Sequence, residues 1–283
     1  MDIKKVAVIG GGTMGNGIAH VFALNNFEVH LTETSETLVN RAINTITSNL
    51  DRQVKKQIIS ETQKSETLKR IISTVGVEKI PSDVQLIIEA IFENKEIKIA
   101  LFKELENRIN EDCIFASNTS SISITELSAV CRPDKFIGMH FMNPVPVMKL
   151  VEVIRAYSTS DQTYNTIKEL SYKLGKEPVE VFDYPGFISN RILMPMINEA
   201  IFALMEGVAS KESIDSVMKL GMAHPMGPLT LADFIGLDVC LAIMNVIYEG
   251  YNDSKYRPCP LLKKMVAANK LGRKTGEGFY KYD

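Results

Sequence analysis

A histidine and a glutamate twelve positions apart are suited to acid–base chemistry. Apolar runs at 135–139 and 149–154, rich in β-branched residues, predict two short buried strands that carry His140 and Glu152. Residues 143–146, Asn-Pro-Val-Pro, are typical of a turn, so the chain would reverse and bring the two side chains together. A carboxylate facing the ring would orient a general base and stabilise its charged form. The alternative is a core histidine satisfied by any polar neighbour, and this stretch alone does not decide between them.

A glycine-rich turn near the N-terminus predicts a dinucleotide site. The apolar run 5–9 leads directly into Gly10-Gly-Gly12-Thr-Met-Gly15, and helical spacing of apolar residues follows. Gly10 would permit the tight turn, Gly12 would let a pyrophosphate approach the backbone, and Gly15 would let the helix pack closely. Thr13 and Met14, at the start of that helix, would present N–H groups to the phosphates.

The residue after the second predicted strand favours one cofactor. The strand 27–31 ends at Thr32-Glu33, about 20 residues past the glycines, where this motif places a ribose-binding acid. Glu33 would accept hydrogen bonds from the ribose diol and repel a 2′-phosphate, so the sequence predicts NAD over NADP. The alternative is a glycine turn that binds nothing, and the second strand and its terminal acid argue against it.

Composition narrows the class of protein. With 283 residues, the chain is long enough for two domains. A net charge of −2 argues against nucleic acid as a partner, and no apolar run reaches the roughly 18 residues of a membrane span. Four scattered cysteines and four histidines show no metal-ligand spacing, so we expect free thiols and no metal. The N-terminus enters a strand without room for a signal peptide, and we expect a cytoplasmic protein.

The predicted fold is an α/β Rossmann-like dinucleotide-binding domain followed by an all-α C-terminal domain. The first domain, residues 1–183, alternates strand and helix and carries a helical insertion near 35–72. The second, residues 184–283, is a substrate and dimerisation domain whose apolar surface exceeds one core, which predicts a homodimer. Its helical patterns lie near 187–206, 211–221, 228–235, 237–250 and 259–269.

Several polar residues stand where these elements end. One face of the insertion carries three cations, Arg52, Lys55 and Lys56. This face would bind a phosphorylated substrate, or it is only a solvated charged surface. Ser123 is predicted to cap a helix, whereas Ser120 and Ser121 are surplus to capping and could contact a ligand. The closing segment 272–280 is either a terminal tether or a means for Lys274 to reach the cofactor.

Seven segments together resemble the (S)-3-hydroxyacyl-CoA dehydrogenases, and most closely the bacterial 3-hydroxybutyryl-CoA dehydrogenases. The resemblance runs through nearly the whole chain. It is carried by the sequences at 8–15, 89–93, 117–121, 138–144, 185–191, 224–228 and 272–276.

The resemblance implies an NAD-dependent oxidoreductase that interconverts (S)-3-hydroxybutyryl-CoA and acetoacetyl-CoA. It implies that His140 is the base, Glu152 its partner, and Ser120 and Asn190 the polar groups around the substrate's C3 oxygen. For NAD it implies the residues Gly10, Gly12, Thr13, Met14, Gly15, Glu33, Glu93, Lys98, Ser120, Asn143 and Lys274. For the acyl-CoA it implies Arg52, where a lysine is usual, and Lys56, with Ser120 and Asn190. The alternatives are a dehydrogenase for a sugar acid such as L-gulonate and a catalytically silent NAD-binding protein.

Overall fold

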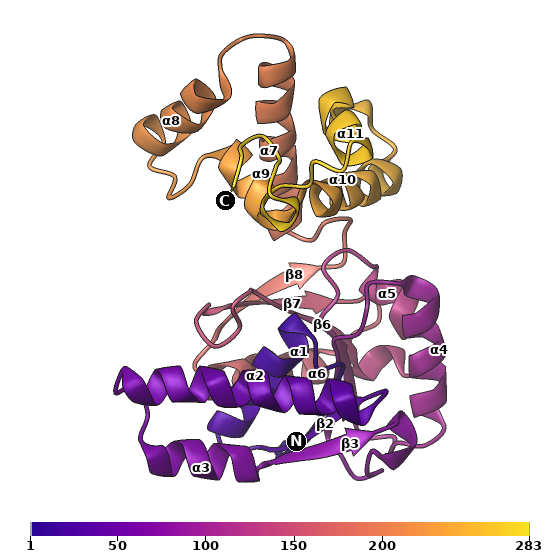
Figure 1. Cartoon of the computed structure of the whole chain (residues 1–283). Coiled ribbons are helices and arrows are strands. Elements are labelled where there is room, and N and C mark those ends of the chain that lie inside the picture. The colour runs from indigo at the N-terminus through magenta and orange to yellow at the C-terminus, as the bar shows by residue number, and fades with distance from the viewer. Residues whose placement is uncertain (1, 283) are drawn as a thin grey trace. The chain divides into compact units, whose positions relative to one another are not determined.

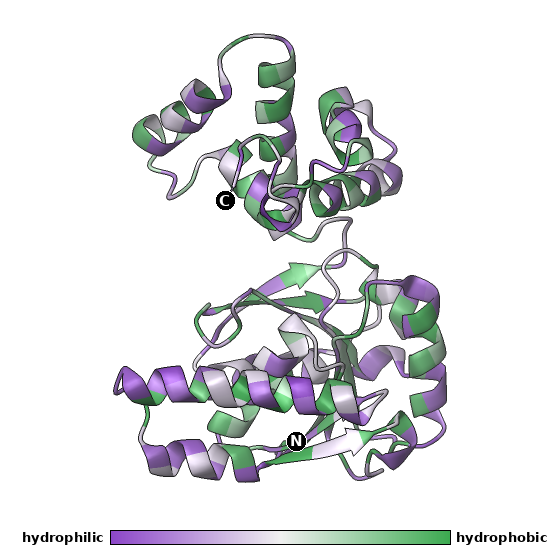
Figure 2. Cartoon of the chain, viewed as in Figure 1, coloured by the Kyte–Doolittle hydropathy of each residue, from purple (hydrophilic) through white to green (hydrophobic). Residues whose placement is uncertain are grey.

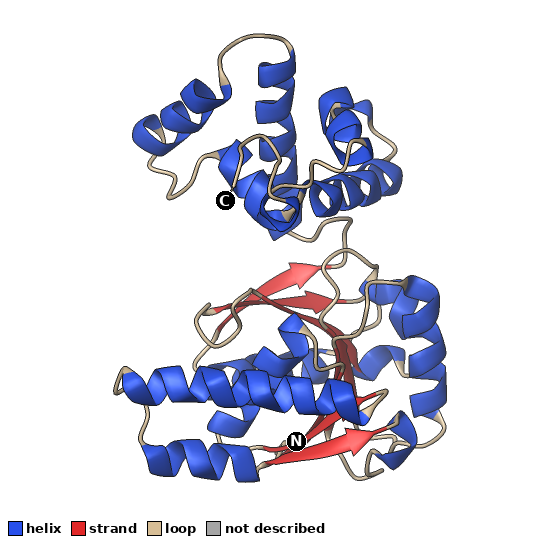
Figure 3. Ribbon diagram, viewed as in Figure 1, coloured by secondary structure: helices blue, strands red, loops and turns tan. Residues whose placement is uncertain are grey.

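The computed structural model describes residues 2–282, and these form two compact units. The division falls between Asp183 and Tyr184, where the sequence changes from alternating strands and helices to helices alone. Figure 3 shows the difference, since strands occur in the first unit and the second contains helices and loops.

The first unit is built on an eight-stranded sheet with the order β3-β2-β1-β4-β5-β6-β7-β8. All neighbouring strands are parallel except β6 and β7, which are antiparallel. The central strands are nearly continuous runs of buried apolar residues, as expected of parallel strands covered on both faces. The strands are β1 (Lys5–Ile9), β2 (Glu28–Glu33), β3 (Ile71–Val75), β4 (Leu86–Glu89), β5 (Ile114–Ser117), β6 (Phe136–Phe141), β7 (Leu150–Arg155) and β8 (Glu177–Phe182).

Helices cover both faces of this sheet (Figure 1). Apolar residues of α1, α2 and α6 share one buried cluster with the strands. On the opposite face Phe102 of α4 lies between Phe115 and Phe136, with ring centroids 5.9 and 4.7 Å away. The helices are α1 (Thr13–Leu24), α2 (Glu36–Lys55), α3 (Glu61–Lys69), α4 (Lys95–Glu106), α5 (Ile124–Ser128) and α6 (Asp161–Lys173).

The predicted helical insertion is partly wrong. Helices α2 and α3 are present, each capped by a serine, Ser35 and Ser60. However, α3 ends at Lys69, and the residues that follow form strand β3, which pairs in parallel with β2. This is an edge strand in which Ile72 is 42% exposed, so the apolar alternation that would reveal it is weak. Figure 2 shows how polar α2 and α3 are beside the apolar central strands.

The second unit packs five helices around its own apolar cluster. Two buried aspartates bind its loops: Asp233 accepts hydrogen bonds from the backbone N–H groups of Phe279 and Tyr280, and Asp215 from those of Leu229 and Thr230. The closing segment is therefore a tether, one of the two predicted roles. The helices are α7 (Ser189–Met205), α8 (Lys211–Gly221), α9 (Pro228–Ile235), α10 (Leu237–Tyr251) and α11 (Pro260–Ala267).

Neither a single membrane-spanning helix nor a metal-ligating cluster occurs in residues 2–282. No single helix there is long and apolar enough to cross a membrane; α9 and α10 reach that limit only as a pair, with a bend of 98° between them. No group of three or more His, Cys, Asp or Glu side chains in the same residues could hold a metal ion. All four cysteines are free thiols, as predicted, and burial raises the pKa of Cys113 and of Cys240 to about 12.

Candidate active site

The predicted hairpin is present and brings the histidine and the glutamate together. Strands β6 and β7 pair so that His140 lies directly opposite Glu152. The distance between His140 Nδ1 and Glu152 Oε2 is 2.7 Å, and the two residues are 7% and 2% exposed. A bond this short between a ring nitrogen and a buried carboxylate is charge-assisted when the ring is protonated. The contact is therefore specific, as the acid–base interpretation requires.

The partners of the ring decide which nitrogen carries the proton. A carboxylate only accepts hydrogen bonds, so Nδ1 of His140 donates to Glu152. In the neutral ring Nε2 then holds the lone pair, and this nitrogen lies 3.1 Å from Ser120 Oγ. The hydroxyl donates to the neutral ring and accepts from the protonated one. His140 thus presents a basic nitrogen beside a hydroxyl.

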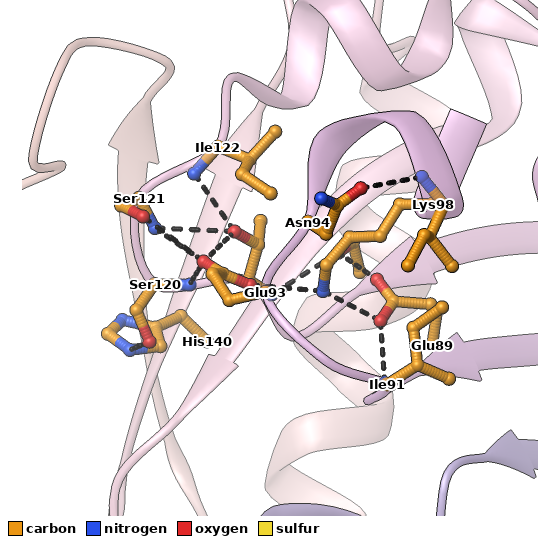
Figure 4. Close-up of polar contacts among 12 residues, drawn as sticks. Glu89, Ile91, Glu93, Asn94, Lys98, Ser120, Ser121, Ile122 and His140 are labelled. Atoms are coloured by element: carbon orange, nitrogen blue, oxygen red, sulfur yellow. Dashed lines mark hydrogen bonds and ion pairs between the residues drawn. The ribbon is translucent and has the colours of Figure 1, made fainter. Parts of the chain in front are cut away.

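Ser120 belongs to a loop that follows β5 and is bound by Glu93 (Figure 4). The Glu93 carboxylate accepts the backbone N–H of Ser120 at 3.0 Å and the hydroxyl of Thr119 at 2.5 Å. Lys98 donates to Glu93 at 3.1 Å and to Glu89 at 2.7 Å. Burial opposes the charge on Glu93, but Lys98 and the loop donors outweigh it and lower the pKa of this carboxyl. The sequence predicted Glu93 and Lys98 as cofactor contacts. It did not predict that the two side chains pair with each other.

The glycine motif opens onto a cleft of about 450 Å³. Gly10 has a φ of +96°, and a Cβ there would lie 2.6 Å from Ala90 O. A Cβ on Gly15 would lie 1.7 Å from Gly10 O, whereas one on Gly12 would meet nothing within 4 Å. Gly10 and Gly15 are therefore needed for the turn and the close packing, and Gly12 faces open space. Met14 packs on the core, so its predicted role concerns its backbone N–H.

Glu33 lies in the wall of this cleft with Gly12, Thr13 and Asn143, all predicted cofactor residues. Its Oε1 accepts the backbone N–H of Gly11 at 2.6 Å, and its Oε2 accepts that of Thr34 at 3.1 Å. Each carboxylate oxygen has a second lone pair, so a ribose diol still finds acceptors there.

Four further polar residues of the cleft were not predicted. They are Asn16 on α1 and Arg41, Thr45 and Asn49 on α2. The last three recur every fourth residue on one helix face, which is the signal that could have revealed them.

The face of α2 continues from this cleft into a groove that ends at Arg52. Two arginines, Arg41 and Arg52, line the groove together with hydroxyl and amide side chains. Arg52 donates a hydrogen bond to the Asn49 side chain, and Lys56 is exposed at the end of the helix. The groove is thus polar and positively charged. It is lined by Thr37, Asn40, Arg41, Asn44, Thr45, Ser48 and Arg52.

Comparison with known proteins identifies the family. Residues 5–184 match the family model of the 3-hydroxyacyl-CoA dehydrogenase NAD binding domain, and residues 186–282 match that of its C-terminal domain. The chain belongs to the 3-hydroxyacyl-CoA dehydrogenase family. The resemblance and the fold class are confirmed, and the cofactor is NAD, as the glycine motif and Glu33 predicted.

Members of this family from distant organisms resemble the chain over nearly its whole length. It is 54% identical to a 3-hydroxybutyryl-CoA dehydrogenase of Bradyrhizobium diazoefficiens, covering 99% of this chain and 96% of the relative. It is 45% identical to the human mitochondrial hydroxyacyl-coenzyme A dehydrogenase, covering 99% and 91%. The crystal structure of (S)-3-hydroxybutyryl-CoA dehydrogenase from Ralstonia eutropha is 49% identical, covers 100% of both chains and superimposes with a TM-score of 0.97.

Two predicted site residues of this 3-hydroxyacyl-CoA dehydrogenase family member lie in the second unit. Asn190 occupies the first turn of α7 and is 8% exposed. Lys274 forms an ion pair with Asp238 at the start of α10. Their predicted contacts, with substrate and with cofactor, stay predictions, as does that of Lys98, whose side chain is 1% exposed.

Proposed function

We propose that this chain interconverts (S)-3-hydroxybutyryl-CoA, or another short-chain 3-hydroxyacyl-CoA, and acetoacetyl-CoA with NAD. The observation that carries the proposal is the hydrogen-bonded series Glu152–His140–Ser120, with distances of 2.7 and 3.1 Å. It lies in an NAD-binding domain of the 3-hydroxyacyl-CoA dehydrogenase family. A base oriented by a carboxylate, in the unit that binds NAD, is what the oxidation of a secondary alcohol needs.

The residues act on the proton while NAD, when bound, takes the hydride from C3. His140 Nε2 accepts the proton of the substrate hydroxyl, and Glu152 offsets the charge that the ring gains. Ser120 donates a hydrogen bond to the C3 oxygen as its charge changes, and the family resemblance implies the same role for Asn190. In the reverse direction the protonated ring polarises the ketone and returns its proton. Such acid–base help is typically worth about 10²–10⁴ in rate.

The α2 groove supports a coenzyme A thioester as substrate. A guanidinium binds phosphate in a planar, bidentate manner, and Arg52 at the groove's end with Lys56 beyond it would receive the phosphates of coenzyme A. A sugar-acid substrate has no such phosphates and would leave both side chains without a role. The relatives that match nearly the whole chain are also named as dehydrogenases of coenzyme A thioesters.

The test is NADH consumption with acetoacetyl-CoA, with free acetoacetate and NADPH as comparisons, repeated with His140→Gln. We expect fast turnover that needs both the thioester and His140. Turnover of free acids but not of the thioester would favour a sugar-acid dehydrogenase. NADH binding without turnover of any substrate would favour the catalytically silent alternative.

We also propose that the protein is a cytoplasmic homodimer formed through its second unit. Large apolar side chains are exposed there, including Ile192 at 67%, Leu220 at 85% and Met222 at 61%. Burying them against a second copy would remove apolar surface from water. Light scattering during gel filtration measures the mass directly, and a mass of one chain at micromolar concentration would contradict the dimer.

The free thiols support the proposed cytoplasmic location, because thiols stay reduced in a reducing compartment.

A further inference from the structure

We infer that Glu89, Lys98 and Glu93 act together as a positioning device for Ser120. This inference rests on the proposed function, because it explains how the hydroxyl beside the base is held. It adds Glu89 to the site and gives Lys98 and Glu93 a role besides any contact with NAD. The series begins in the core at the end of β4 and ends at the loop beside His140 (Figure 4).

Lys98 and Glu89 form the buried end of this series. Their side chains are 1% and 0% exposed, and Lys98 Nζ lies 2.7 Å from Glu89 Oε1. Glu89 also accepts the backbone N–H of Ile91 at 2.7 Å and the hydroxyl of Ser117 at 2.6 Å. A buried ammonium is costly unless its partners are held in good geometry. These partners come from β4, β5 and α4, so Lys98 is held by rigid elements.

Glu93 links this fixed ammonium to the loop. Its Oε2 lies 3.1 Å from Lys98 Nζ, and its Oε1 accepts four hydrogen bonds from the loop. Two of these come from backbone N–H groups, of Ser120 at 3.0 Å and Ser121 at 3.2 Å. The other two come from the hydroxyls of Thr119, at 2.5 Å, and Ser121, at 3.1 Å. One carboxylate therefore fixes the backbone on either side of the Ser120 side chain.

The consequence is a defined position for the Ser120 hydroxyl relative to the base. Bonds to the backbone of Ser120 leave its side chain available for His140 Nε2, 3.1 Å away. If Glu89 loses its charge, Lys98 keeps Glu93 as its charged partner, and both shift toward each other, carrying the loop with them. A displacement of about 1 Å at a reacting group can cost about 10²-fold in rate.

The test removes the Glu89 charge and asks whether the effect passes through Ser120. Glu89→Gln keeps the size of the side chain, and we expect kcat to fall about 10- to 100-fold. In a Ser120→Ala background the same substitution should lower kcat by less than about 3-fold, because the positioned group is already absent. An equal factor in both backgrounds, or an unchanged kcat in the Glu89→Gln variant alone, would overturn the inference.

A matched control is available at another charged pair of the first unit. Glu106 accepts a hydrogen bond from buried Arg132 at 2.8 Å. Glu106→Gln makes the same chemical change beside a buried cation, and we expect a loss of thermal stability with kcat unchanged. A fall in kcat equal to that of Glu89→Gln would mean that loss of any carboxylate beside a buried cation has this effect, and would overturn the inference.

Two further measurements keep the inference testable if Glu89→Gln does not fold or if the proposed reaction fails. Thr119→Val keeps every charge but removes the hydroxyl that donates to Glu93 and accepts the backbone N–H groups of Ser121 and Ile122. It loosens the same loop and should show the same dependence on Ser120. The ring resonances of His140, assigned with His140→Gln, report the Ser120 contact without turnover. Thr119→Val should move them in the same direction as Ser120→Ala, and unmoved resonances would overturn the positioning role. Wild-type enzyme inactive on acetoacetyl-CoA would refute the proposed function alone.

Discussion

Replacing Glu152 with glutamine tests how much of the rate depends on its charge. The side chain keeps its size and an oxygen that can accept from His140 Nδ1, 2.7 Å away in the wild type, so the ring can keep its tautomer. What disappears is the attraction between carboxylate and imidazolium. A hydrogen bond to a charged group is worth about 1.5–3 kcal/mol net. Two unit charges about 4 Å apart attract by about 4 kcal/mol at an effective dielectric constant of about 20.

These values bracket the expected loss in kcat at about 10- to 10³-fold, at 1.4 kcal/mol per factor of ten. The loss should appear in kcat, because the ring becomes charged during the reaction and is neutral when the hydroxyl binds. The KM for the 3-hydroxyacyl-CoA should stay within about 3-fold, since Glu152 is 2% exposed and lies behind the ring. Steady-state kinetics of the oxidation at several pH values measure kcat and KM. Glu180→Gln, an exposed glutamate on β8, is the control. A raised KM with unchanged kcat would refute the reasoning.

Three other predictions follow from single residues or pairs. Glu33→Gln should improve kcat/KM for NADPH about 10-fold or more, because it removes a negative charge facing the 2′-phosphate; an unchanged NADH/NADPH ratio would contradict this. Arg52→Ala with Lys56→Ala should raise KM for acetoacetyl-CoA about 10-fold or more and leave the Kd for NADH unchanged, as a fluorescence titration can check. Burial lowers the pKa of His20 from 6.5 to about 4, so the unfolded state binds more protons between these values and stability falls as pH drops through this window. Between pH 7 and pH 5 this costs about 2 kcal/mol, and denaturant unfolding of His20→Gln should show that much less pH dependence.

Much of the fold follows from local patterns in the sequence. Strand β1 and the glycine turn lie at the predicted residues, because the apolar run and the glycines that follow it are unambiguous. Strand β3 was missed because it lies at the edge of the sheet, where two consecutive residues, Ile72 and Ser73, are exposed. The end of α2 has no clear signal in the sequence either: the helix stops at Lys55, and Gln57 then adopts a φ of +57° where a glycine would be expected.

The site was predicted less completely than the fold. Antiparallel pairing on either side of a turn fixes register, so the contact between His140 and Glu152 could be expected from spacing alone. The series from Glu89 through Lys98 to Glu93 could not be predicted from spacing. It joins the end of a strand, a helix and a loop that is 27 residues away from Glu93. Charged residues at 93–98 are ordinary for the start of a helix, and only packing shows that Lys98 is buried.

The reversed strand β7 explains why one sheet serves both cofactor and base. In a parallel sheet, neighbouring strands need a crossover of a dozen or more residues, whereas an antiparallel pair needs only a turn. The turn from β6 to β7 begins near Asn143, and Asn143 and Val145 line the cleft beside the glycine motif. Buried Lys176 donates to the carbonyls of Val145 and Met148 and so fixes this turn. The same few residues therefore set the register of the His140–Glu152 pair and shape the wall of this cleft. A change that moves the turn should disturb NAD binding and the base together, whereas Glu152→Gln should affect the base alone.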